Sequence, residues 1–143
     1  MNELLWVGLL ATSFAFILLV FRLFGKHGLF AWMPVCVIAA NIQVIKTIEV
    51  FGITATLGNI VYASSFLITD ILSENYGKRD ARRAVLYGLG AIVGFTALMA
   101  LALPFAPSPE DSAQEHLSAL FTVLPRITVA SLAAYTVSQF HDV

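Results

Sequence analysis

The stretch LLWVGLLATSFAFILLVF, residues 4–21, holds no charged side chain, and Arg22 is the first charge after it. A bilayer core of roughly 30 Å needs about 20 helical residues to cross it. No cationic residue precedes the stretch and no small-residue cleavage site follows it. We therefore interpret it as a retained membrane span and not as a removable signal peptide. The chain is predicted to be an integral membrane protein.

The composition of the whole chain supports a membrane protein and excludes several other classes. Apolar residues make up 59% and charged residues 12%, against about 45–50% and 25% in soluble domains. The net charge is −1, whereas nucleic-acid binding needs a basic face, so a nucleic-acid-binding protein is not expected. Cys36 has no disulfide partner, and His27, His116 and His141 share no spacing, so no metal site is predicted. No catalytic motif is present, so we expect neither an enzyme nor a bound cofactor.

Further apolar blocks predict an all-α fold, a polytopic transmembrane helical bundle with about five spans in one domain, residues 1–143. Each span must be helical, because an isolated strand would leave its backbone groups unpaired in lipid. The predicted spans are residues 4–24, 29–48, 54–75, 81–103 and 117–139. Asp80 is a suitable N-cap for the fourth helix. Gly90 and Gly94 in that helix form a G-x-x-x-G pair, which would let a neighbouring helix approach closely.

The basic residues predict the orientation of the chain. Six of the eight Lys and Arg fall in two loops on one side: Arg22, Lys26, Lys78, Arg79, Arg82 and Arg83. Basic loops stay in the cytoplasm, whereas acidic residues have little influence on orientation. We therefore expect a multi-pass inner-membrane protein with its N-terminus outside and its C-terminus in the cytoplasm.

Three of the predicted helices carry polar side chains at membrane depth. An ionisable residue there costs a few kcal/mol or more and usually has a function. Gln43, Lys46 and Glu49 recur every three residues on the second helix, and Arg126 lies near the middle of the fifth. The third helix carries a polar stripe made of Asn59, Tyr62, Thr69, Asp70 and Glu74. The fifth helix carries a second stripe made of Thr128, Ser131, Tyr135, Ser138 and Asp142. These patterns predict a polar cavity for a planar heterocycle that has both donors and acceptors.

Structural roles for the same residues stay open at this point. Asp70 and Glu74 could pair with Arg82 or Arg83 near the cytoplasmic end of their helix. Lys46 could extend its ammonium to interfacial water. Ser131 and Ser138 could bond carbonyls of their own helix.

Several motifs together resemble a known family, the queuosine precursor transporters within the vitamin uptake transporters. They are ANIQVIK (40–46), GNIVY (58–62), FLITDILSENYGK (66–78), PRI (125–127) and SQFHDV (138–143). The resemblance implies a membrane transporter that imports deazaguanine bases, precursors of the tRNA nucleoside queuosine. The substrate-binding residues that it implies are Asn41, Gln43, Lys46, Tyr62, Asp70, Glu74, Arg126, Gln139 and Asp142.

The family pattern continues beyond the Asp-Val motif, so we expect this chain to be C-terminally truncated. Two alternatives follow: a substrate-binding membrane subunit that needs a separate energising module, or a non-transporting truncated fragment. The expected partners are a deazaguanine base and membrane lipid, without nucleic acid. A homo-oligomer, the preferred precursor and the coupling ion are left open.

Overall fold

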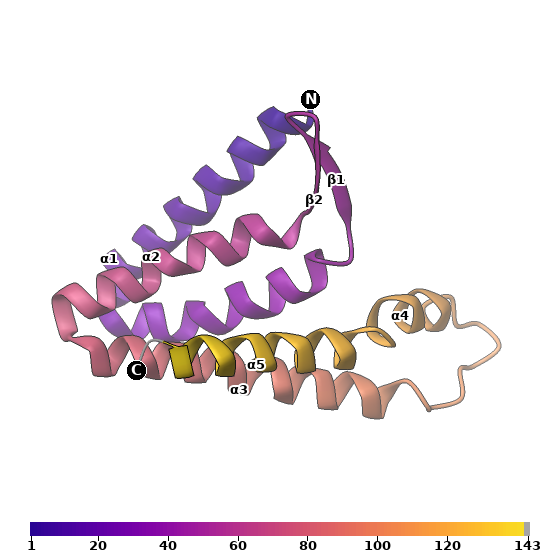
Figure 1. The fold of residues 1–143 in the computed structure, drawn as a ribbon. Coiled ribbons are helices and arrows are strands. Elements are labelled where there is room, and N and C mark those ends of the chain that lie inside the picture. Colours follow the sequence, from indigo (N-terminus) through magenta and orange to yellow (C-terminus); the bar gives the residue numbers. More distant parts are fainter. Residues whose placement is uncertain (142–143) are drawn as a thin grey trace. The chain divides into compact units, whose positions relative to one another are not determined.

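A computed structural model of the chain is mostly helical and describes the backbone of residues 1–141 and the side chains of residues 1–134 (Figure 1). The elements in chain order are α1 (Asn2–Gln43), β1 (Thr47–Val50), β2 (Ile53–Thr56), α2 (Gly58–Tyr76), α3 (Lys78–Ala102), α4 (Gln114–Phe121) and α5 (Leu124–His141). They form two compact units, Met1–Ala91 and Ile92–Val143, and each is described by itself.

Helix α1 is bent at Gly25 into two limbs. Gly25 has φ 57° and ψ −142°, a conformation that is open to glycine and strained for other residues. Just beyond the bend, a Cβ on Gly28 would lie 2.3 Å from the carbonyl oxygen of Val20. The second limb can therefore leave the bend in close contact with the first, and Figure 1 shows it turning back.

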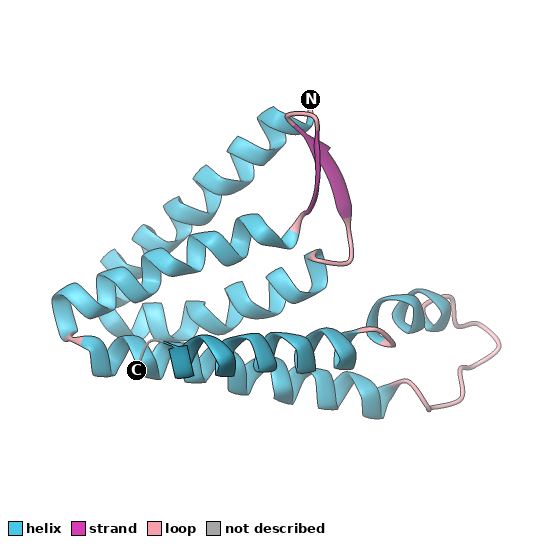
Figure 2. Cartoon of the chain, in the orientation of Figure 1, coloured by secondary structure: helices cyan, strands magenta, loops and turns pink. Residues whose placement is uncertain are grey.

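A β-hairpin separates α1 from α2, so the predicted all-α fold was wrong for this segment. Strands β1 and β2 pair antiparallel with Val50 opposite Ile53, and they are the magenta arrows in Figure 2. Phe51 and Gly52 form the loop at φ 53° and 74°, the positive values of a two-residue type I′ turn. β-Branched residues flank this turn and favour strands. The helices predicted to reach residue 48 and to begin at residue 54 instead end at Gln43 and begin at Gly58.

The core of the Met1–Ala91 unit lies between α2 and both limbs of α1, with the start of α3 packed beside it. Its buried residues are Ile17, Leu29, Met33, Cys36, Ala40, Val61, Ile68, Leu72 and Ala84. Gly88 of α3 packs so closely that a Cβ there would lie 2.7 Å from Cγ2 of Val37. Gly90 and Gly94 have no such neighbour among the described residues. The close approach predicted for that glycine pair is therefore made by Gly88.

The turn between α2 and α3 corrects the predicted role of Asp80. Helix α3 begins at Lys78, and Asp80 is its third residue. The backbone N–H groups of Asp80 and Ala81 donate to the carbonyl of Gly77 at 3.1 and 3.4 Å. Gly77 thus occupies the position before the helix, and the Asp80 side chain is available for other contacts.

The Ile92–Val143 unit contains the end of α3 together with α4 and α5. The fifth helix was predicted as one element over residues 117–139, but the structure breaks it at residues 122–123. Pro125 explains the break, because proline has no N–H to donate and its ring clashes with the carbonyl four residues earlier. The hydroxyls of Thr96 and Thr128 share a buried hydrogen bond of 2.8 Å that joins α3 to α5. At the start of α4, Asp111 accepts hydrogen bonds from the N–H groups of Ala113 and Gln114.

Length and composition identify the segments that can cross a membrane. Among the described residues these are α1, α3 and Gln114–Ala134. Helix α2 does not meet the same criterion, although it packs against both limbs of α1. Helix α2 carries several polar side chains between Asn59 and Asn75.

Candidate functional site

One face of α2 is polar and aromatic and is exposed within the described part of the Met1–Ala91 unit. Its exposed residues, spaced by three or four, are Asn59, Tyr62, Phe66, Asp70 and Glu74. Residues at this spacing lie on the same side of a helix. The opposite side is buried through Val61, Ile68 and Leu72 in the core with α1. Packing against α1 thus determines which side of α2 remains accessible.

An aromatic pair occupies the middle of this exposed face. The rings of Tyr62 and Phe66 meet edge to face, with centroids 5.5 Å apart and an interplanar angle of 81°. Both side chains are about half exposed, at 53% and 55%. They offer aromatic surface to a planar ligand. Sequence reasoning singled out Tyr62 but missed Phe66, although Phe66 lies one helical turn further on the same stripe.

Two carboxylates continue the face beyond the aromatic pair. Asp70 and Glu74 are exposed, and neither carboxylate has an ion pair or a hydrogen bond within the described residues. Their predicted alternative partner Arg83 instead binds Asp80 at 3.3 Å. The pairing that would have given these carboxylates a purely structural role is thus not observed.

The hydroxyl groups of α2 are already engaged by its own backbone. The side chains of Ser65, Thr69 and Ser73 donate to the carbonyls of Tyr62, Phe66 and Asp70, at 2.6, 2.8 and 3.1 Å. Thr69, which the sequence placed on the polar stripe, thus bonds the backbone of its own helix. The carboxylates therefore remain the strongest acceptors on this face.

The C-terminal end of α1 brings two predicted site residues close to the start of α2. A Cβ on Gly58 would lie 2.3 Å from the carbonyl oxygen of Ala40, so the two helix ends are in contact. Asn41 is buried, and its Nδ2 donates to the carbonyl of Val37 at 2.8 Å. Gln43 is half-buried, and its Oε1 is fully buried with no donor among the described residues. A buried acceptor without a donor is costly, and a ligand N–H would satisfy it.

Lys46 does not share a helical face with Gln43, contrary to the sequence prediction. Helix α1 ends at Gln43, and Lys46 lies exposed in the turn before β1. Its backbone carbonyl accepts a hydrogen bond from the N–H of Leu57 at 2.8 Å, which closes the base of the hairpin. The spacing of three that linked Gln43, Lys46 and Glu49 thus spans a turn and a strand.

The remaining predicted residues belong to the other unit. Arg126 is the third residue of α5 and is exposed, not near the middle of a long helix. It has no ion pair within the described residues. The side chain of Gln139 and the whole of Asp142 lie outside the described residues.

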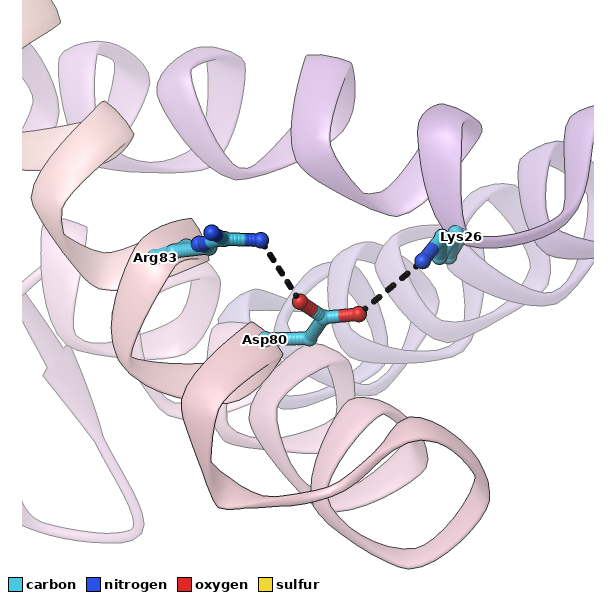
Figure 3. A network of polar contacts seen from close by, with 3 residues as sticks. All are labelled: Lys26, Asp80 and Arg83. Atoms are coloured by element: carbon cyan, nitrogen blue, oxygen red, sulfur yellow. Dashed lines mark hydrogen bonds and ion pairs between the residues drawn. The ribbon is translucent and has the colours of Figure 1, made fainter.

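A second polar network lies at the other end of the Met1–Ala91 unit, at the bend of α1 (Figure 3). Asp80 is 7% exposed. Its Oδ2 accepts from Nζ of Lys26 at 3.1 Å, and its Oδ1 accepts from the guanidinium of Arg83 at 3.3 Å. The Lys26 ammonium also lies 5.5 Å from the ring centroid of Tyr76. Sequence reasoning missed this network, although Asp80 is the only acid within the basic run 78–83.

Comparison with known proteins gives two matches. Residues 56–143 match the family described as "Putative vitamin uptake transporter". The chain is also 42% identical over 142 residues to a Bacillus subtilis (strain 168) protein named "Probable queuosine precursor transporter". That alignment covers 99% of this chain but 62% of the relative, so the chain spans less than two thirds of the relative's length. No solved structure matches.

Proposed function

The chain belongs to the family described as "Putative vitamin uptake transporter", and on this premise we propose that it imports a queuosine precursor, a deazaguanine base, across the inner membrane. The family is one of multi-pass membrane transporters and not of enzymes. The name of the Bacillus subtilis relative supports the substrate class. The observation that carries the proposal is the exposed face of α2. Phe66 lies one turn from Asp70 on this face and Tyr62 one turn further, and the Asp70 carboxylate has no partner within the described residues.

The energetics of membrane insertion favour a ligand at this face. On insertion scales an aspartate costs roughly 2.5–3.5 kcal/mol at the centre of a membrane helix, and less toward the end of the helix, where Asp70 lies. If Asp70 faced lipid without a partner, nothing would offset this free energy of insertion. A water-filled cavity or a bound substrate would remove it, and this supports α2 as the lining of a transport path.

The chemistry of the face matches a deazaguanine base. Such a base presents an N–H and an NH₂ side by side, and one carboxylate can accept from both. We propose that Asp70 accepts both donors and that Tyr62 offers its ring for stacking. The full proposed set of substrate-binding residues is Asn41, Gln43, Lys46, Tyr62, Asp70, Glu74, Arg126, Gln139 and Asp142.

We also propose that the N-terminus is outside and that both basic loops face the cytoplasm. The ion pair between Lys26 and Asp80 supports this orientation, because it joins the loop at the bend of α1 to the loop before α3. Two basic loops at one end of the same unit agree with the positive-inside rule.

Uptake in cells that cannot make the precursor would test the proposal. Cells expressing this chain are given a deazaguanine base, and queuosine in their tRNA is measured by mass spectrometry. We expect queuosine to appear with the native chain and to be lost with Asp70→Ala. Glu110→Gln, which alters an exposed loop carboxylate, serves as the control and should retain uptake.

Binding of the same base to the purified chain separates the alternatives. Binding without uptake would indicate a capture subunit that needs an energising module. The absence of both uptake and binding would contradict the proposed function. Normal uptake by Asp70→Ala would remove Asp70 from the site.

A further inference from the structure

The first turns of α3 and the end of the first limb of α1 carry cations that pair with no carboxylate within the described residues. Arg22, Lys78, Arg79 and Arg82 are exposed and have no ion pair within the described residues. We call these four residues the basic surface. Glu74, in the last turn of α2, has no ion pair with any of them.

The carboxylate closest to the basic surface in sequence pairs with two other cations. Asp80 is nearly buried and is engaged by Lys26 and Arg83 (Figure 3). The cations at this end of the unit therefore fall into two sets. Lys26 and Arg83 form the first set and stabilise the turn between α2 and α3 through Asp80. The basic surface is the second set, and its cations can bind an external anion.

The residues of the basic surface lie at the ends of helices that can span a membrane, and this places them relative to the bilayer. Lys78 is the first residue of α3, which is long and apolar enough to span a membrane, and Arg22 follows the apolar first limb of α1. The ion pair between Lys26 and Asp80 holds these two helix ends together. Cations at the end of a span lie at the depth of lipid headgroups.

We propose that the basic surface binds the headgroup phosphates of anionic phospholipids, with Arg79 and Arg82 making the principal contacts. Residues three apart lie on the same side of a helix, so both guanidinium groups can reach one phosphate region. Guanidinium groups bind phosphate through two parallel N–H donors. An anionic headgroup leaves the phosphate charge uncompensated, whereas the choline of a zwitterionic lipid cancels it. The basic surface therefore selects anionic lipid.

Lipid retention tests this proposal on the full chain. The protein is reconstituted in nanodiscs of equal parts phosphatidylglycerol and phosphatidylcholine, released, and examined by native mass spectrometry. We expect phosphatidylglycerol to be retained in preference, and we expect each arginine removed from the basic surface to weaken its retention about fivefold. Arg82→Gln should therefore lose about fivefold, and Arg79→Gln/Arg82→Gln more.

Arg83→Gln is the matched control, because it removes one positive charge from the first turns of the same helix, but a charge that already pairs with Asp80. It should retain phosphatidylglycerol at the native level, and Arg82→Lys should retain part of it. Unfolding midpoints in pure phosphatidylcholine nanodiscs identify any variant that fails to fold. If an Arg→Gln variant fails to fold, the partial loss of phosphatidylglycerol by Arg82→Lys tests the proposal in its place. Equal retention of both lipids, native retention by a folded Arg79→Gln/Arg82→Gln, or displacement of the lipid by inorganic phosphate would overturn the proposal.

Discussion

A Cβ atom on Gly58 would lie 2.3 Å from the carbonyl oxygen of Ala40, so the first residue of α2 has no room for a side chain. The neighbouring atom is backbone and cannot rotate away. We expect Gly58→Ala to destabilise the protein by about 1–3 kcal/mol, the usual cost of overpacking. Thermal unfolding in detergent would measure the change.

Gly90→Ala is the matched control for that substitution. Gly90 also lies in a helix, but no atom among the described residues is within 4 Å of the place that a Cβ would take there. Alanine favours helix over glycine by roughly 1 kcal/mol. Gly90→Ala should leave the unfolding midpoint unchanged or raise it, and an equal loss in both variants would show that close packing at Ala40 is not the cause.

The hydrogen bond between Thr96 and Thr128 predicts coupling between α3 and α5. Its oxygens are 2.8 Å apart and buried. Each single change to valine should cost about 1 kcal/mol, because the remaining hydroxyl loses its partner. The double variant should be more stable than the sum of the two single losses implies. Strict additivity in the double-mutant cycle would mean that the two hydroxyls do not interact.

Gln43 allows a substrate contact to be distinguished from a structural one. Its Oε1 is buried with no donor among the described residues, so Gln43→Met removes an unsatisfied acceptor and keeps a similar shape. We expect the unfolding midpoint to stay level or to rise, since an unpaired buried acceptor costs about 1–3 kcal/mol, while uptake of the deazaguanine base falls. A variant that is less stable and yet fully active would assign Gln43 to the fold alone.

Asp80→Asn tests the network at the bend of α1. The amide keeps the shape of the side chain but leaves Lys26 and Arg83 without an opposite charge. We expect a lower unfolding midpoint, with a smaller difference at high salt because both cations are partly exposed. Unfolding at low and high NaCl, with Glu110→Gln as the equal-charge control, measures the effect. An unchanged midpoint at low salt would show that the network does not stabilise the fold.

The helical character of the chain could be predicted from hydropathy because backbone pairing in lipid permits few alternatives. Patterns of three and four residues also placed Tyr62, Asp70 and Glu74 on one face of α2 correctly. The hairpin at 47–56 could not be read in the same way. Its β-branched residues, such as Ile48, Val50 and Ile53, are also common in membrane helices, so they were assigned to the helices on either side.

Contacts between distant residues were the second kind of feature that sequence could not provide. Lys26 and Asp80 are 54 positions apart, and each has a plausible local role, as a topology signal and as a helix cap. Arg126 was placed near the middle of a long helix because the break before Pro125 was not anticipated. In both cases the local pattern was real, but the tertiary arrangement gave the residue a different position.

The bend of α1 at Gly25, where φ is positive, allows this long helix to fit into a bilayer. Without that bend, Asn2–Gln43 would be one straight helix of 42 residues, about 63 Å long at 1.5 Å per residue. A hydrocarbon core is roughly half as thick. Because glycine has no Cβ atom, α1 can bend at residue 25 and form two limbs that fit within the membrane. Any other residue at this position would add a Cβ atom and strain the backbone.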